Sequence, residues 1–387
     1  MHVTVEEHMQ GGYYTRNFQQ GARDDTIILN LGPQHPSTHG VLRVLLELDG
    51  EYVVRAEPVL GYLHRMHEKM AEVKNPVQFM SNMGRVDYLH AIAWNWAYAG
   101  AVERLAEIVV PERAEYLRVI TTELNRLSSH LVWWGTYILD IGAFTPVLYA
   151  FDDREEILDI LQMVTGSRLT YCYLRFGGVC QDAPPDFFSR IKAFIPRLRK
   201  RLPMYKALVT ENMILLGRID DIGVVPEEMC RRYGATGPVL RGAGTAYDVR
   251  RAEPYSVYHR FDFDVPVRKS ACSLGRYLVR MDEMEQSLRI LEQAVAGIPE
   301  GPVMPEKPLK QNFKLPAGEV AFAVEGARGK IKVWIASDGG KNPYRIKLRS
   351  PSFSNLSLFP EASRGTLIAD AVAILGSLDL VIPELDR

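Results

Sequence analysis

Two short apolar runs near the start of the chain, residues 26–30 and 41–48, are separated by a loop rich in Gly, Pro and His. Apolar runs of this length with turn residues between them are typical of β-strands. Asp49-Gly50 follows the second run, is a favourable hairpin turn, and leads into another apolar stretch. The pattern predicts an N-terminal β meander over residues 26–60.

Beyond the meander, residues 61–300 place apolar positions mostly at helical spacing, which predicts a central helical bundle. The predicted long helices, amphipathic or rich in Ala, Trp and Leu, are residues 85–109, 112–134, 187–215 and 274–295. A segment rich in Gly, Pro and Arg, residues 217–265, interrupts them and is expected to be irregular.

The last part of the chain, residues 301–387, begins with a proline-rich crossing segment. Apolar and polar residues then alternate over residues 319–336 and 344–349, on either side of the turn Asp338-Gly339-Gly340. This predicts a small antiparallel sheet, followed by a helix at 366–376 and a tail. The fold class is therefore α+β: an N-terminal β meander, a central helical bundle, and a C-terminal mixed sheet and helix.

One apolar segment, residues 131–151, is about long enough to cross a bilayer and has a single ionisable residue, Asp140. A charge near the middle of a membrane span is costly, and Gly135, Gly142 and Pro146 interrupt the segment. We therefore expect a buried helix, a loop and the start of a second helix.

Composition excludes several classes of function. The chain is 47% hydrophobic with a formal net charge of −1 and no long basic stripe, so it has a sizeable core and no electrostatic support for nucleic-acid binding. Its four cysteines form no CxxC pair, which argues against a metal site built from this chain alone and suits a reducing compartment. Residues 1–25 are polar and acidic, and predict either an arm on a partner or a disordered segment.

The loop Leu31-Gly32-Pro33-Gln34-His35-Pro36-Ser37-Thr38-His39-Gly40 is the strongest candidate for chemistry. Two prolines and two glycines make a tight loop that holds imidazoles at a fixed point. Imidazole titrates near neutral pH, so such a histidine can donate a proton and recover it. From residue type alone, either histidine serves equally well to brace the loop by hydrogen bonds.

Further motifs resemble the large subunit of nickel–iron hydrogenases without its metal ligands. The segment from Met83 to His90 resembles CGxCxxxH, with Met83 and Val86 in place of the cysteines. The segment 379–387 resembles DPCxxCxxH, with Val381 and Glu384 in those places. Nickel needs soft thiolate ligands, so hydrogenase activity is nearly excluded. Shorter matches are Arg65-Met66-His67-Glu68 to RGxE, residues 325–329 to EAPRG, residues 343–345, and residues 349–352.

With the histidine loop, these motifs resemble the D-subunit family of the proton-pumping NADH:quinone oxidoreductases, respiratory complex I, over residues 26–387. The resemblance implies a hydrogenase-like fold in which the old metal cavity has become a quinone site. It implies that His39 and Tyr88 contact the two quinone carbonyls and that Asp140 pairs with His39. Residue type alone also permits Tyr88 as core packing and Asp140 as an N-cap of the following helix.

Four further residues are expected around the quinone or the neighbouring cluster, and no metal ligand is expected. They are His35, Met83, Arg85 and Glu68. The resemblance places the cation of Arg85 near an iron–sulfur cluster of a partner subunit, where a surface ion pair is the simpler alternative. His64, His67 and His90 form too loose a set for a metal site.

The resemblance also implies the surroundings of the chain. Quinone would be the substrate, this chain would hold no redox cofactor, and electrons from NADH would arrive through the cluster of a B-type subunit. C-type and I-type peripheral subunits and a membrane H-type subunit would complete a hetero-oligomer on the cytoplasmic face of the bacterial inner membrane. Two alternatives stay open: a related complex fed by ferredoxin or deazaflavin, and a non-catalytic scaffold between the arms. Arg65-Met66-His67 and the missing proline after Asp379 depart from the common pattern.

Overall fold

The computed structural model describes residues 18–20, 25–34, 40–306 and 312–387. Its N-terminal part is an antiparallel sheet in the order β1-β2-β3-β4, which confirms the predicted meander. The strands are β1 (Phe18–Gln20), β2 (Ile27–Gln34), β3 (Leu42–Asp49) and β4 (Tyr52–Val59). Strand β2 extends to Gln34, so the histidine loop is shorter than predicted; His35 and His39 lie outside the described residues.

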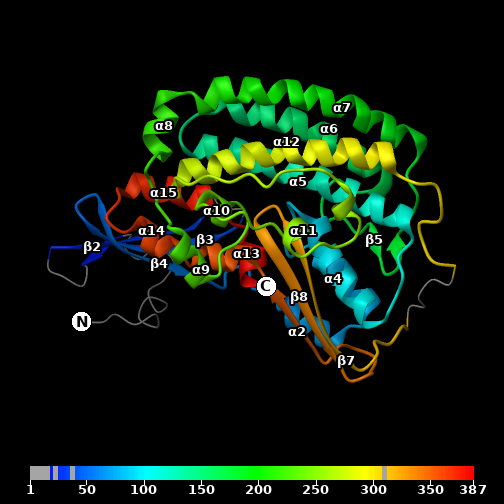
Figure 1. Cartoon of the computed structure of the whole chain (residues 1–387). Coiled ribbons are helices and arrows are strands. Elements are labelled where there is room, and N and C mark those ends of the chain that lie inside the picture. The colour runs from blue at the N-terminus through cyan, green and yellow to red at the C-terminus, as the bar shows by residue number, and fades with distance from the viewer. Residues whose placement is uncertain (1–17, 21–24, 35–39, 307–311) are drawn as a thin grey trace.

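The middle of the chain is helical, as predicted. Figure 1 shows α5, α6, α7 and α12 running side by side as one layer. The helices are α2 (His67–Val73), α3 (Pro76–Met83), α4 (Ala91–Leu105), α5 (Glu112–Asp140), α6 (Thr145–Thr165), α7 (Pro185–Tyr205), α8 (Met213–Ile219), α9 (Glu227–Tyr233), α10 (Pro238–Gly242), α11 (Val249–Ala252) and α12 (Ser273–Gly297). Between them lie β5 (Leu174–Arg175), β6 (Gly178–Val179), a π-helical turn (Lys206–Thr210) and a 3-10 turn (Tyr258–Arg260).

Helix α4 begins at Ala91, six residues later than the predicted start at residue 85. The carboxylate of Asp87 is the reason: its Oδ1 accepts the backbone N–H groups of Leu89 at 2.9 Å and His90 at 3.1 Å. This local capping holds the chain in a turn until residue 91. Tyr88 therefore sits on a turn and not on the long helix.

The apolar segment 131–151 is the end of α5, a short loop and the start of α6, as expected. Gly135 allows the two helices to touch, because a Cβ there would lie 3.1 Å from both Ala150 and Val147. Within the described ranges, no helix is both long and apolar enough to cross a membrane.

The C-terminal sheet has three strands in the order β7-β8-β9. The alternating run 319–336 is two strands and not one, because the chain reverses at Ala327-Arg328 inside the EAPRG-like motif. The strands are β7 (Gly318–Gly326), β8 (Gly329–Ser337) and β9 (Arg345–Arg349), and the helices after them are α13 (Pro351–Leu356), α14 (Phe359–Ser363), α15 (Ile368–Leu378) and α16 (Ile382–Asp386).

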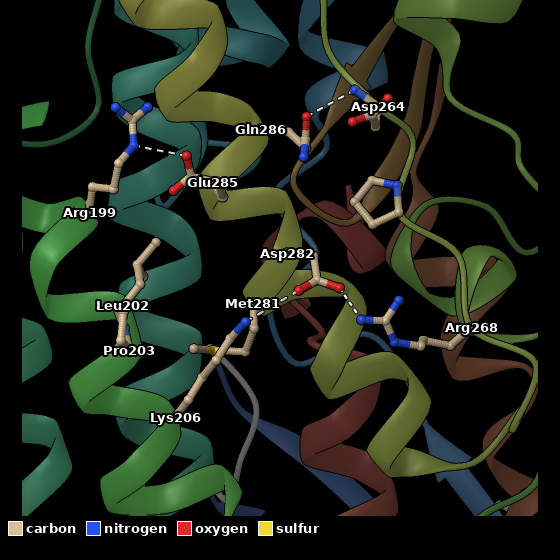
Figure 2. A pocket seen from close by; sticks show the side chains of 11 residues that line it. Arg199, Leu202, Pro203, Lys206, Asp264, Arg268, Met281, Asp282, Glu285 and Gln286 are labelled. Atoms are coloured by element: carbon tan, nitrogen blue, oxygen red, sulfur yellow. Dashed lines mark hydrogen bonds and ion pairs between the residues drawn. The ribbon is translucent and has the colours of Figure 1, made fainter. Parts of the chain in front are cut away.

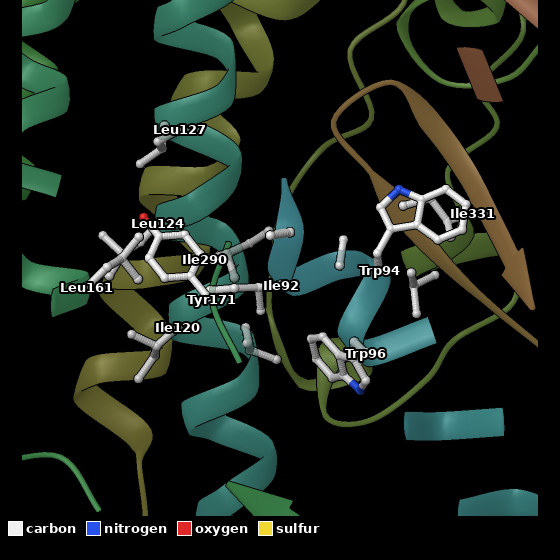
Figure 3. Close-up of a cluster of buried hydrophobic side chains, with 14 of the residues drawn as sticks. Ile92, Trp94, Trp96, Ile120, Leu124, Leu127, Leu161, Tyr171, Ile290 and Ile331 are labelled. Atoms are coloured by element: carbon white, nitrogen blue, oxygen red, sulfur yellow. The ribbon is translucent and has the colours of Figure 1, made fainter. Parts of the chain in front are cut away.

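The core joins the helical layer to the C-terminal sheet through α4, which packs against α5 on one side and β7 and β8 on the other. Figure 3 shows this arrangement: Trp94 points toward Ile331 of β8, while Ile92 faces the helices that carry Leu124 and Ile290. A second cluster packs the N-terminal sheet on α14, α15 and α16. The predicted α+β, hydrogenase-like architecture is confirmed, and both clusters border the C-terminal segment.

Candidate functional site

Tyr88 lies where three distant segments of the chain meet. The half-buried ring packs against a cluster of the buried residues Leu89, Val132 and Val381. Val132 comes from α5, and Val381 directly precedes α16. The C-terminal segment therefore reaches Tyr88.

Gly40 places the end of the histidine loop close to the same segment. A Cβ on this buried glycine would lie 2.7 Å from Leu63, 2.9 Å from Ile382 and 3.2 Å from Pro383. Its φ of +128° is also a conformation that side chains rarely tolerate. The chain thus leaves the loop beside the residues that follow Val381, although His35 and His39 themselves are not among the described residues.

Asp140 is the last residue of α5 and is exposed in this chain. It lies two turns beyond Val132, about 12 Å along the helix axis at 1.5 Å per residue. The N-cap of α6 is Phe144, which makes no side-chain cap, so the alternative of Asp140 as an N-cap is wrong. The described residues do not bring Asp140 into contact with Tyr88.

A buried charge cluster lies directly behind Tyr88. The Arg328 guanidinium contacts Asp87 (Nη1 to Oδ2, 2.9 Å), Asp379 (Nη2 to Oδ1, 3.4 Å) and the Ser129 hydroxyl (3.2 Å). Asp379 is shared with Arg280, whose Nε lies 3.7 Å from Oδ2. Sequence reasoning missed this cluster, although Arg328 and Asp379 both belong to motifs that it had singled out.

The environment keeps the phenol of Tyr88 protonated. Burial raises its pKa to about 12, and the neighbouring Asp87 carboxylate adds to the shift. No hydrogen bond joins its hydroxyl to another residue that the structure describes. Tyr88 can therefore offer a proton to a ligand at neutral pH.

The four positions that match hydrogenase cysteines are all buried. Met83 and Val86 pack in the main core, Val381 contacts Tyr88, and Glu384 is the one ionisable residue of the four. His90, beside them, accepts from the N–H of Ala327 through Nδ1 (2.9 Å) and faces the carbonyl of Thr122 with Nε2. Across the described ranges, no three His, Cys, Asp or Glu side chains are grouped as metal ligands would be.

Arg85 and Glu68 lie in different settings. Arg85 is exposed and donates to the carbonyl of Ser81 at 2.7 Å. The Glu68 carboxylate pairs with Arg345 at 2.9 Å and accepts the N–H of Leu348 at 3.0 Å. Glu68 thus fastens α2 to β9, whereas Arg85 extends toward solvent on the turn that carries Tyr88.

His67, in the RGxE-like motif, is buried and neither ring nitrogen has a hydrogen-bond partner among the described residues. Burial lowers its pKa to about 4, and the nearby Arg65, His64 and Arg85 act in the same direction. The folded chain therefore holds neutral His67 at pH 7.

His67→Leu is expected to make stability less sensitive to acid. The unfolded chain binds a proton at His67 below about pH 6.5, whereas the folded chain resists it down to about pH 4, so stability falls as the pH drops through this window. Urea unfolding of the purified chain at pH 7.5 and pH 5 tests this. The wild type should lose about 2 kcal/mol more than the variant between these pH values; equal losses would contradict the assignment.

A second buried network ties the helical layer to the C-terminal sheet. Arg241 bonds to Glu283 (Nη2 to Oε1, 2.6 Å) and to Glu325 (Nη1 to Oε1, 2.8 Å). Arg250 pairs with Glu123 at 3.1 Å. These residues are at most 1% exposed. Other members are Asp248, Arg126, His130, Tyr258 and Ser287.

A groove of about 500 Å³ lies between α7, α12 and the segment before α12. Figure 2 shows its charged side chains in pairs, with Asp282 between Lys206 and Arg268, and Arg199 on Glu285. None of the predicted site residues lines it. Its charges compensate one another, so it offers no concentrated field to a charged ligand.

Comparisons with known proteins agree with this geometry. The family model described as respiratory-chain NADH dehydrogenase, 49 Kd subunit, matches residues 140–311 and 307–387. The NADH-quinone oxidoreductase D subunit of Desulfotalea psychrophila is 60% identical over 94% of this chain and 98% of its own length. The second of the numbered D subunits of Opitutus terrae is 57% identical over 95% and 92%, and the D subunit of Geobacillus kaustophilus is 50% identical over 94% and 99%. The chain belongs to the family of NADH-quinone oxidoreductase D subunits, the 49 kDa subunits of respiratory complex I.

Proposed function

We propose that this chain forms the chamber in which the complex reduces quinone. Tyr88 donates to one quinone carbonyl, and His39, paired with Asp140, donates to the other. The observation that carries the proposal is the position of Tyr88: a protonated phenol, half-buried at the junction of three segments, directly before a buried charge cluster. The position of Gly40, against Ile382, supports the approach of the histidine loop.

The described residues suit proton delivery to a reduced headgroup. Quinone reduction takes up two electrons and two protons, and each oxygen needs a donor in a sheltered site. Leu89, Val132 and Val381 shelter the ring of Tyr88 from water, and Asp87 fixes the turn that carries it. His39 supplies the second proton and is restored through Asp140.

Electrons from NADH reach the chamber through the iron–sulfur cluster of a B-type neighbour, which supplies them singly. This chain holds no redox cofactor of its own, and the exposed Arg85, on the turn before Tyr88, is the cation that faces the cluster. C-type, I-type and membrane H-type subunits complete the surroundings on the cytoplasmic face of the bacterial inner membrane. Reduction is coupled to proton translocation by the membrane subunits.

Tyr88→Phe tests the proposal because it removes only the hydroxyl. NADH:quinone activity of membranes should fall roughly 10²-fold, the lower range for loss of a positioned acid. NADH:ferricyanide activity, which draws electrons upstream of quinone, should stay unchanged. Both rates are measured on one membrane sample.

Tyr344→Phe is the matched control, since Tyr344 is 73% exposed and the change again removes one hydroxyl. It should alter neither rate. Wild-type quinone activity in the Tyr88 variant would overturn the proposal in favour of a scaffold. Quinone reduction without NADH oxidation in the wild type would indicate a different electron donor.

A further inference from the structure

Glu384 of α16 is a fully buried carboxyl that binds only neutral donors within the part of the chain described. Trp94 Nε1 donates to Oε2 at 3.0 Å, and the backbone N–H of Ser352 donates to Oε1 at 3.1 Å. The Ser352 hydroxyl also bonds to Oε1. These contacts orient the carboxyl group without neutralising a charge on it.

The neighbouring charges do not neutralise it either. Asp87, Asp379 and Glu384 are three buried carboxyls, whereas Arg328 and Arg280 are two buried guanidiniums. Both guanidiniums make their ion pairs with the two aspartates. One proton on the cluster therefore balances its charge, and an unbalanced buried charge is costly.

Cations on the other elements near Glu384 point their donors elsewhere. Arg349 of β9 donates to the carbonyls of Gly234 and Lys330. Arg387 donates to the carbonyl of Leu348 at 2.8 Å. Neither makes an ion pair with Glu384, so neither replaces the proton.

The balance of effects on Glu384 favours the protonated form near neutrality. Burial and then the Asp87 carboxylate raise its pKa to about 7, against the opposing effects of Arg328, Ser352 and Trp94. Since Oε2 accepts from Trp94, the proton belongs on Oε1, facing the Ser352 hydroxyl. The carboxyl group thus changes charge within the working pH range.

Two short connections link Glu384 to Tyr88. Val381, which packs on Tyr88, donates its N–H to the Ser352 hydroxyl at 3.2 Å, and that hydroxyl bonds to Glu384. On the other side, Asp87 precedes Tyr88 in the chain and shares Arg328 with Asp379. A negative charge on Glu384 therefore adds to the field of Asp87, which already opposes loss of the Tyr88 proton.

We propose that Glu384 is a positioning residue whose proton keeps the cluster behind Tyr88 neutral, and that loss of this proton slows proton donation from Tyr88 to quinone. The inference rests on the proposed function of Tyr88. Glu384 does not contact quinone and transfers no proton to it. Its ionisation should appear as a falling limb in the pH profile of quinone reduction.

Glu384→Gln is the first test, on membranes that carry the whole complex. Above pH 7 the protonated fraction of one group falls about tenfold per pH unit. The wild-type ratio of quinone rates at pH 6 and pH 8.5 should therefore be roughly 10 or more, with the ferricyanide rate flat. In the variant, which cannot ionise, this ratio should be close to one. A wild-type ratio in the variant would overturn the inference.

Ser352→Ala tests the same idea without changing the carboxyl group. It removes a hydroxyl that stabilises the carboxylate, so the falling limb should move to higher pH. Ser357→Ala is the matched control, because the Ser357 hydroxyl bonds only to the carbonyl of Phe353 at 2.9 Å. The control limb should not move. An unmoved limb in Ser352→Ala, or a shift to lower pH, would contradict the role of Glu384.

Infrared spectra of the purified complex separate this inference from the proposed function. Wild type at pH 6 should show a protonated-carboxyl carbonyl band that is absent at pH 8.5 and absent in Glu384→Gln. Absence of that band would overturn the protonation of Glu384. If the band is present but Tyr88→Phe reduces quinone normally, the role of Tyr88 fails and the coupling of Glu384 to it fails too, while the titration itself stands.

Discussion

Arg241→Ala is expected to cost about 3–5 kcal/mol of folding free energy, the range for breaking a buried ion pair. Arg241 is fully buried and holds the carboxylates of Glu283 and Glu325 together. Its removal leaves two buried acids with too little positive charge. The measurement is the urea midpoint of the purified chain, together with the amount of chain recovered in the complex.

The pH dependence of this loss provides an internal check. Arg241 is the main neighbour that holds the pKa of Glu283 far below its usual range, so the wild type gains stability from Glu283 above about pH 4.5 and loses it on acidification. The difference between variant and wild type should therefore shrink toward pH 4. Arg231→Ala, which breaks the exposed pair with Glu227, should cost under about 1 kcal/mol. Equal effects at the two arginines would contradict a special contribution from the buried one.

Asp87→Ala is expected to abolish most quinone activity and also to destabilise the chain by about 3 kcal/mol. The change leaves Arg328 with Asp379 alone and frees the N–H groups of Leu89 and His90 that fix the Tyr88 turn. The NADH:quinone rate, divided by the amount of assembled complex on a native gel, measures the first effect.

Asp87→Asn separates the turn from the charge. The amide oxygen can still accept the N–H groups of Leu89 and His90, whereas the charge opposite Arg328 is lost. Asn should therefore keep more activity per assembled complex than Ala, while both lose stability. Equal activity in Ala and wild type would show that the turn does not position Tyr88.

The fold was largely predictable because its periodic signals are local. The meander, α5, α6 and α12 each follow from apolar spacing and turn residues near their ends. The start of α4 was wrong because one carboxylate, Asp87, captures the two N–H groups before it. The reversal at Ala327-Arg328 was missed because the alternation of β7 continues into β8.

The candidate site divides in the same way. Tyr88 and the segment from Asp379 were found through motifs, and the structure brings Val381 of that segment to Tyr88. The charge cluster joins Asp87, Arg328 and Asp379, which are far apart in sequence. Spacing cannot pair such residues, because only the tertiary fold determines which charges share a buried space. The placement of His35 and His39 remains a prediction.

The packing of Val381 on Tyr88 also sets an order of events during synthesis. At 5–20 residues per second, the ribosome needs roughly 15–60 s to proceed from Tyr88 to Val381. During that interval the turn has neither Val381 nor Asp379 to pack against, and Trp94 lacks its acceptor Glu384. The nascent chain thus completes its quinone-facing wall among its last steps, so chaperones and the assembly of the complex have this interval in which to act.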